Sequence, residues 1–134
     1  MNSTIASDTK TDVDQQAHEL LVDESVLEQM ILDTNADIIP ILIDHYVEES
    51  QNRLVVIQEA ATSKDAQTLE FEVHTLGSTA LSLGNRPLGE LARALEKQCL
   101  EQNHEDAFSK VSELIELAER SIEALVQRKN AGFS

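Results

Sequence analysis

The sequence predicts an all-α protein: an antiparallel up-and-down four-helix bundle with an accessory N-terminal helix. Composition and periodicity both support this prediction. Hydrophobic residues make up 41% of the 134 residues, whereas aromatic residues make up 3%, and the chain has four glycines and two prolines. Sheet proteins usually contain more aromatic and turn-forming residues. From residue 20 onward, apolar residues also recur with the period of an α-helix.

The N-terminal part of the chain is expected to contain a tail and one short helix. Residues 1–19 are polar, acidic and without periodicity, which predicts a disordered acidic tail ahead of a helical bundle over residues 20–128. An amphipathic pattern over residues 22–32 predicts the accessory helix, lying across one end of the bundle. Residues 129–134 are expected to fray.

The first two long helices have recognisable boundaries. Asp37 is a candidate N-cap for a helix that continues to residue 61. Ser63 is a candidate N-cap for the next helix, and Gly84 is well placed to end it. Its core-facing stripe is expected to contain the apolar residues Leu69, Val73, Leu76, Ala80 and Leu83.

The last two long helices follow after short connections. Asn85 is a candidate N-cap for a helix that has Pro87 in its first turn and Cys99 on its core face. Asn103 and Asp106 resemble a capping pair for a final helix that reaches residue 125. Four amphipathic helices with short connections favour antiparallel neighbours.

Charge and cysteine content exclude several classes of function. The chain has 25 acidic and 10 basic residues and a formal charge of −15, so nucleic acid and anionic membrane surfaces are disfavoured partners. No apolar run approaches the roughly 20 residues that span a bilayer. The N-terminus lacks the features of a signal peptide, and the single cysteine rules out an internal disulfide. We expect a cytoplasmic protein.

One histidine stands out from the four in the chain. His18, His45 and His104 lie in polar segments and are expected to be ordinary surface residues. His74 lies in the middle of a predicted long helix, about 140° around the helix axis from the centre of the apolar stripe. It should therefore face solvent.

The residues one or two turns from His74 are unusual for a solvated helix face. They include apolar side chains and a glycine that costs roughly 0.5–1 kcal/mol relative to alanine in a helix interior. The glycine could permit close helix packing, and the apolar residues could touch a neighbouring helix. Together around an exposed imidazole, they also fit a surface on which another protein docks. The candidate docking residues are Glu70, Phe71, Gly77, Ser78 and Leu81.

Other chemistry has little support in the sequence. There is no His-x-x-x-His pair, and Glu101 with His104 gives only a single Glu-x-x-His motif, whereas a di-metal bundle needs two. Cys99 lies on a core stripe, and neither a Gly-x-Ser-x-Gly motif nor a glycine-rich phosphate loop is present. We therefore predict no bound metal and no ATP site. A histidine nucleophile towards a phosphoryl group delivered by another protein remains.

The segment from His74 to Gly84, HTLGSTALSLG, followed by Leu95-Glu96, resembles the signature of histidine-containing phosphotransfer (HPt) domains of bacterial phosphorelays. The resemblance implies that His74 is the phosphorylated residue. It also implies that Leu76 and Gly84 are structural positions of the motif and that Glu96 is the family's acidic residue on the next helix.

By the same resemblance, the protein would be a phosphoryl carrier rather than an enzyme. It would act as a monomer and shuttle a phosphoryl group between receiver-domain aspartates. Its partners would be response-regulator receiver domains, a hybrid sensor kinase, or both. Such a carrier binds no cofactor of its own, and Mg²⁺ would belong to the receiver.

The motif departs from the family pattern at two positions. Gly77 stands where the family has lysine, and Ser78 stands where it has glycine. Compensation for the missing cation would have to come from elsewhere, and the nearest cations in sequence are Lys64, Arg86 and Arg93. The alternative function is an HPt-like bundle that is not phosphorylated and acts only as a protein-interaction module. A metal-binding bundle is a third, less supported reading.

Overall fold

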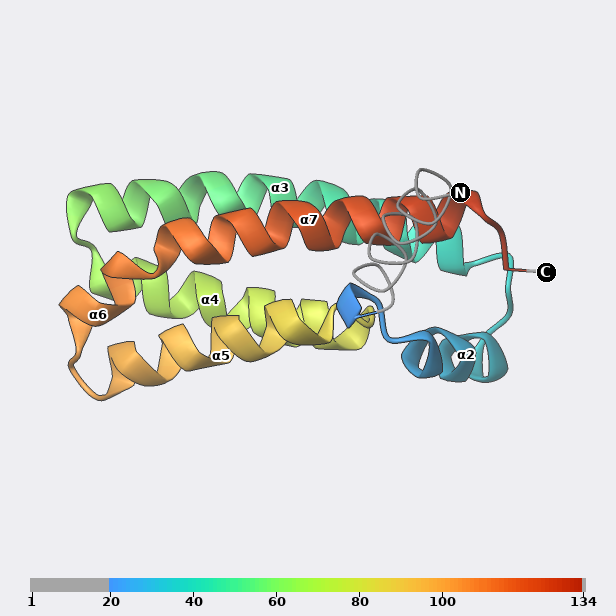
Figure 1. Ribbon diagram of the computed structural model, residues 1–134, viewed down its shortest axis with the longest axis horizontal. Helices are drawn as coiled ribbons and strands as arrows, with labels where there is room; N and C mark the ends of the chain where they lie inside the picture. The colour runs from blue at the N-terminus through green and yellow to red at the C-terminus, as the bar shows by residue number, and fades with distance from the viewer. Residues whose placement is uncertain (1–19, 134) are drawn as a thin grey trace, which may run out of the picture.

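Residues 20–133 are described by a computed structural model of the 134-residue chain. The predicted tail over residues 1–19 lies outside the described residues, as does residue 134. The described part contains six helices, arranged as shown in Figure 1. They are α2 (Glu24–Asp33), α3 (Ile39–Ser63), α4 (Ala66–Ser82), α5 (Arg86–Leu100), α6 (His104–Ser109) and α7 (Val111–Asn130).

The helices confirm the predicted all-α fold with an antiparallel bundle. Successive long helices α3, α4, α5 and α7 run in alternating directions, with α3 beside α7 and α4 beside α5 (Figure 1). The accessory helix α2 lies at one end as predicted, but it lies in line with the α4/α5 pair and beyond it rather than across the bundle. No helix within residues 20–133 is long and apolar enough to cross a membrane.

The core is formed by the apolar stripes of the four long helices. On α4, the predicted stripe is confirmed: Leu69, Val73, Leu76 and Ala80 are completely buried, whereas Leu83 is half-buried at the helix end. The largest fully buried side chains of the other three long helices are Ile39, Ile43, Ile57, Leu88, Leu95, Val111, Leu114 and Leu125. Because the α4 stripe is fully buried, the orientation of the opposite face of this helix is fixed.

The predicted N-caps of the first two long helices are wrong. Ile38, not Asp37, is the N-cap of α3, and no side chain caps this helix. The Asn35 side-chain oxygen instead accepts hydrogen bonds of 2.9 and 3.2 Å from the N–H groups of Asp37 and Ile38, in the turn before the helix. Asp65, not Ser63, caps α4 and accepts bonds from the backbone and hydroxyl of Thr68 at 3.1 and 2.6 Å. Helix α3 itself continues through Ser63, so that residue cannot serve as a cap for α4.

The predicted final helix is split in two. Lys110 separates α6 from α7, and its N–H bonds to the carbonyl of Ala107, three residues earlier. The Ser109 hydroxyl donates to the Asp106 carbonyl at 2.7 Å, which competes with continuation of the helix. The Asn103 side chain makes no capping bond, so the predicted Asn103–Asp106 capping pair is absent.

Gly84 ends α4 as predicted. Its φ angle of 89° is a left-handed conformation that favours glycine. The N–H of Asn85 returns to the carbonyl of Ala80 at 2.8 Å, as in a Schellman turn. The carbonyl of Gly84 also accepts a bond of 2.7 Å from the N–H of Asp23, which joins this turn to the start of α2.

Asn85 is a buried bridge rather than a helix cap. Its side chain makes no capping bond with α5 and is completely buried. The Tyr46 hydroxyl donates to its oxygen at 2.8 Å, and its amide nitrogen donates to the carbonyls of Leu21 and Ser121 at 2.9 and 3.2 Å. Burial raises the pKa of Tyr46, so the hydroxyl remains a donor.

The C-terminal end has more contacts than the expected fraying implies. Helix α7 continues to Asn130. The guanidinium of Arg128 lies 4.5 Å from the ring centroid of Phe133 and donates to the carbonyl of Gly132 at 2.6 Å. These contacts hold residues 132 and 133 against the last turn of the helix.

Candidate functional site

His74 lies on the exposed face of α4, as the stripe predicts. The helix is fixed by its buried residues, including Val73 and Leu76 on either side of the histidine. The His74 side chain is 57% exposed, so its imidazole is accessible from solvent.

Glu96 on α5 holds the imidazole. Its Oε2 lies 2.6 Å from Nδ1 of His74, and the Glu96 side chain is only 18% exposed. A carboxylate accepts hydrogen bonds, so the proton of a neutral imidazole lies on Nδ1 in this contact. Nε2 then carries the free lone pair. The pair therefore fixes the ring and leaves one nitrogen with a free lone pair on an exposed side chain.

Glycines allow α4 and α5 to approach closely at this level. A Cβ placed on Gly77 would lie 3.5 Å from both the Ala92 Cβ and the Gly89 carbonyl oxygen. A Cβ on Gly89 would lie 2.6 Å from Cγ of Leu81, a distance that side chains do not tolerate. The short distance between the two helices is what brings Glu96 within hydrogen-bonding reach of His74.

This packing decides between the two interpretations of Gly77. Gly77 is buried against α5, so it is a helix-packing residue and not part of an exposed docking surface. Leu81 is half-buried and packs over Gly89, so it too contacts the neighbouring helix. Gly77 is therefore corrected to a contact within the bundle, whereas Leu81 makes such a contact and also keeps an accessible part.

The other predicted docking residues stay on the surface near His74. Phe71, one turn before the histidine, is 66% exposed, an unusual degree for a phenyl ring. Glu70 and Ser78 are half-buried, and the Ser78 hydroxyl donates to the His74 carbonyl at 3.2 Å. The exposed imidazole thus has Phe71 and Glu70 one turn before it and the small polar Ser78 one turn after it.

The remaining candidate residues do not join the site. His45 is exposed on α3 and His104 begins α6, whereas His18 lies outside the described residues. Cys99 is buried, and this burial raises the pKa of its thiol. Within residues 20–133, no group of three or more His, Cys, Asp and Glu side chains is placed to hold a metal ion.

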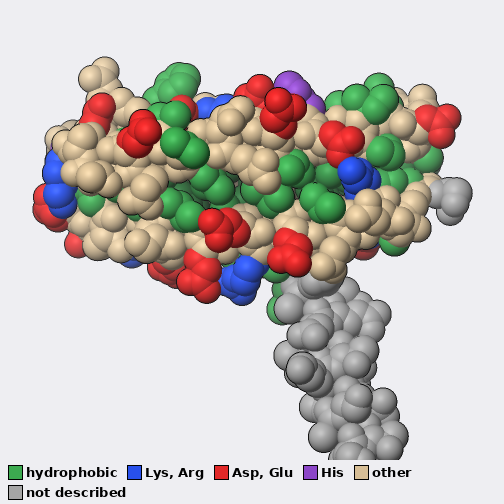
Figure 2. Space-filling view, turned by 90° about the horizontal axis from the view of Figure 1, so that it is seen from above, with side chains coloured by type: hydrophobic (Ala, Val, Ile, Leu, Met, Phe, Trp, Pro, Cys, Tyr) green, Lys and Arg blue, Asp and Glu red, His purple; other side chains and the backbone are tan. Residues whose placement is uncertain are grey.

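A separate groove lies on the face formed by α3 and α7, where Figure 2 shows apolar side chains between the two helices. It has a volume of about 700 Å³, and its lining includes Val47, Leu54, Val55, Ile115, Ile122 and Val126. None of its lining residues belongs to the site around His74, which is built from α4 and α5.

Of the three cations nearest to His74 in sequence, the structure places Arg93 beside the site. Cγ of Arg93 would lie 3.3 Å from a Cβ on Gly77, so the Arg93 side chain covers this glycine. Arg93 precedes Glu96 by three residues on α5, and this spacing places the two on neighbouring positions of one helix face. This spacing could be seen in the sequence. It predicts a position near His74 only when the rotation of α5 relative to α4 is known.

Comparisons with known proteins agree with this architecture. The family model for the Hpt domain matches residues 41–128. Among solved structures, the chain is similar to the crystal structure of histidine-containing phosphotransfer protein B (HptB) from Pseudomonas aeruginosa PAO1. The TM-score is 0.70 at 25% sequence identity, over 83% of this chain and 93% of that chain. No curated protein matches the sequence.

Proposed function

Because the chain belongs to the Hpt domain family, we propose that it carries phosphoryl groups on His74 in a phosphorelay. The observation that supports this most directly is the bond between Nδ1 of His74 and Glu96, which leaves Nε2 exposed as a nucleophile. On this proposal the protein is a carrier and not an enzyme, and the two aspartates it serves belong to receiver domains or a hybrid sensor kinase.

On this proposal, the two nitrogens of the His74 ring have different roles in the transfer. Nε2 attacks the phosphorus of an aspartyl phosphate, the P–O bond to the aspartate breaks, and the aspartate leaves as a carboxylate. The new N–P bond makes the ring cationic while Nδ1 keeps its proton, and the adjacent Glu96 carboxylate stabilises that charge. The reverse reaction delivers the group to a second aspartate. Positioning dominates such a step, and Mg²⁺ on the receiver would neutralise the phosphoryl oxygens.

The receiver would dock around the exposed imidazole. Phe71 offers apolar area, and Glu70, Ser78 and the accessible part of Leu81 surround the histidine on the same helix. Since His74 projects from one face of one bundle, a single copy of the chain suffices for transfer. We therefore propose a monomeric carrier. That it acts in the cytoplasm is a separate part of the proposal.

Transfer from phosphorylated receivers tests the assignment. A panel of receiver domains, each labelled on its aspartate with radioactive acetyl phosphate, is mixed with the wild-type chain, His74→Gln and His45→Gln. We expect at least one receiver to give acid-labile phosphate on the wild-type and His45→Gln proteins and none on His74→Gln. Acid-labile phosphate that persists on His74→Gln would show that the site is wrong. Receiver binding without transfer would instead support a pure interaction module.

A further inference from the structure

The charge balance around His74 raises the question of which cation serves it. A phosphoryl group on Nε2 adds negative charge beside the Glu96 carboxylate, in a chain whose formal charge is already −15. The cationic ring and the Glu96 carboxylate offset each other, so the charge of the phosphoryl oxygens is balanced only if another side chain supplies a cation. Gly77, one turn after His74, supplies no side chain.

Two of the three nearest cations in sequence are engaged elsewhere. Arg86 donates two hydrogen bonds to Asp23, at 2.6 and 3.1 Å, at the start of α2. Together with the Ser25 hydroxyl, these bonds lower the pKa of Asp23 to about 2. Lys64 pairs with Glu105 at 3.2 Å and lies 5.0 Å from the ring centroid of Phe108, at the α6 end of the bundle.

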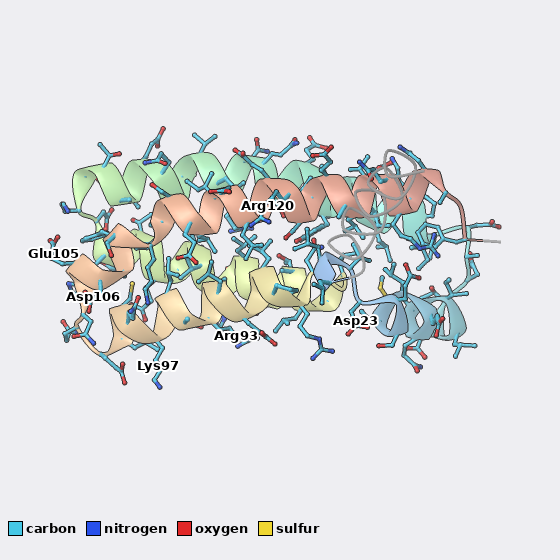
Figure 3. The ribbon with its side chains drawn as sticks, in the orientation of Figure 1. Asp23, Arg93, Lys97, Glu105, Asp106 and Arg120 are labelled. Atoms are coloured by element: carbon cyan, nitrogen blue, oxygen red, sulfur yellow. The ribbon has the colours of Figure 1, made fainter. Side chains whose placement is uncertain are left out.

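Arg93 is placed differently. Its side chain starts from α5, the helix that also carries Glu96, and its Cγ covers Gly77 on α4. Figure 3 labels it on the side of α5 away from α3 and α7. The residue is exposed, and its guanidinium takes part in no ion pair among residues 20–133.

The distances along α4 make the contact feasible. Gly77 follows His74 by three residues, a rise of about 4.5 Å. The guanidinium of Arg93 extends beyond a Cγ that already lies against Gly77, so a change of rotamer directs its N–H groups along α4 towards the histidine. A lysine or any other long side chain at position 77 would occupy the same space. The glycine is therefore what gives Arg93 access to this surface.

We propose that Arg93 binds the phosphoryl group on His74, donating hydrogen bonds from its guanidinium to the phosphoryl oxygens. The biological role of this contact rests on the proposed function. In this contact, the cation comes from Arg93 on α5 instead of from a residue on α4. Arginine suits the task, since its planar fork of donors matches phosphate oxygens.

Phosphoramidate tests this contact without a partner protein. In that reaction the P–N bond of the reagent breaks and ammonia leaves. The Nε2 lone pair forms the new N–P bond. The proton stays on Nδ1, which continues to donate a hydrogen bond to Glu96. The rate of phosphorylation of His74 is followed by NMR, from the shift of the His74 ring resonances. These resonances distinguish His74 from the other histidines. We expect Arg93→Gln to slow the reaction about two- to fivefold, the effect of one exposed ion pair, and Arg93→Lys to recover most of the rate.

Arg120→Gln is the matched control, because Arg120 is also an exposed arginine but lies on α7 (Figure 3). It should leave the rate unchanged. A second readout reports the contact itself: in the wild-type protein, phosphorylation should shift the Nε–H resonance of Arg93 and not that of Arg120. The double variant Arg93→Ala with Gly77→Lys moves the charge to α4 and should restore the rate lost in Arg93→Ala.

Equal rates for Arg93→Gln and Arg120→Gln, with an unmoved Arg93 resonance, would overturn the proposal. This result is distinguishable from failure of the proposed function. The reagent modifies an accessible histidine whether or not a receiver exists, so failure of every receiver to exchange phosphate leaves the Arg93 test intact. Conversely, a receiver can exchange with His74 even if Arg93 makes no contact.

Discussion

At the scale of residues, the site is one hydrogen bond that gives the two nitrogens of an imidazole different roles. Nδ1 of His74 faces the carboxylate of Glu96, and Nε2 is left without this partner on a side chain that is 57% exposed. The outward direction of His74 could be predicted from helical periodicity alone, since its helix has an uninterrupted apolar stripe. Its pairing with Glu96 could not, because it depends on which helix lies beside α4; only the resemblance to a family singled out Glu96.

Glu96→Gln should weaken the nucleophile while leaving the fold intact. A glutamine amide can donate as well as accept, so it no longer fixes the proton on Nδ1, and it does not stabilise the cationic ring that transfer produces. We expect His74 to react with phosphoramidate about three- to tenfold more slowly, a loss of about 1 kcal/mol. The ¹⁵N shifts of the ring should change from the Nδ1–H tautomer towards a mixture.

Glu90→Gln serves as the control for this substitution, since Glu90 is an exposed acidic residue on the same helix. It removes the same charge without touching the imidazole. If the two variants react at the same rate, the effect of Glu96 is no more than general electrostatics and the orienting role is excluded.

At the scale of elements, the site depends on the close packing of α4 against α5. The sequence predicted that both helices exist and which stripes they bury, because period and apolar residues suffice for that. It did not predict the caps correctly. Between α3 and α4 several polar residues in a row can each cap a helix, and the choice is made where α3 ends, at Lys64 in the left-handed conformation with φ of 59°.

The role of Gly77 shows the same limit. Sequence reasoning left open whether this glycine exposed the histidine or allowed close packing, since a helical wheel gives the direction of a residue but not the distance of its neighbour. The contact with Ala92 and Gly89 answers the question. The glycine pair shortens the distance between the helices, and Glu96 reaches His74 as a result.

Two alanine substitutions in this contact should differ in their effect on stability. Gly89→Ala brings a methyl group to 2.6 Å from Cγ of Leu81 and must displace it. Overpacking of this kind costs about 1–3 kcal/mol, of which about 1 kcal/mol is recovered through helix propensity. Gly77→Ala meets the flexible Arg93 stem at 3.3 Å, so the gain in propensity should offset the crowding. Urea unfolding should therefore give a lower free energy of unfolding for Gly89→Ala only.

The effects of Gly89→Ala and Gly77→Ala can also be measured at His74. Displacement of Leu81 by Gly89→Ala should lengthen the Nδ1–Glu96 bond and shift the His74 ring resonances, whereas Gly77→Ala should leave them in place. Equal stability of the two variants would contradict the packing argument.

At the scale of the whole molecule, the helices are joined by a buried polar network that no local sequence pattern predicts. Asn85 was expected to cap a helix because it directly precedes one, and that expectation follows a sound local rule. In the structure its side chain reaches Leu21, Tyr46 and Ser121, which are 64, 39 and 36 residues away. Contacts of such separation depend on the complete topology, so they could not be derived from the sequence around Asn85.

This network also connects stability to the site. Asn85 follows Gly84 directly at the turn between α4 and α5, and Gly84 bonds to Asp23 at the start of the accessory helix. The two helices that carry His74 and Glu96 are thus fixed at this turn to α2, α3 and α7 at once. Loss of the network should loosen the turn before it affects the imidazole, because His74 on α4 and Glu96 on α5 each lie more than ten residues from Asn85.

Asn85→Ala should be among the most destabilising single substitutions in this chain. It leaves the Tyr46 hydroxyl and the carbonyls of Leu21 and Ser121 without their partner in a buried position and also opens a small cavity. We expect a loss of about 2–4 kcal/mol in the free energy of unfolding, measured with urea. Asn103→Ala is the matched control, because Asn103 also precedes a helix but is exposed and makes no capping bond. It should change stability by less than about 0.5 kcal/mol. Similar losses for the two variants would mean that the buried long-range bonds of Asn85 add nothing to stability.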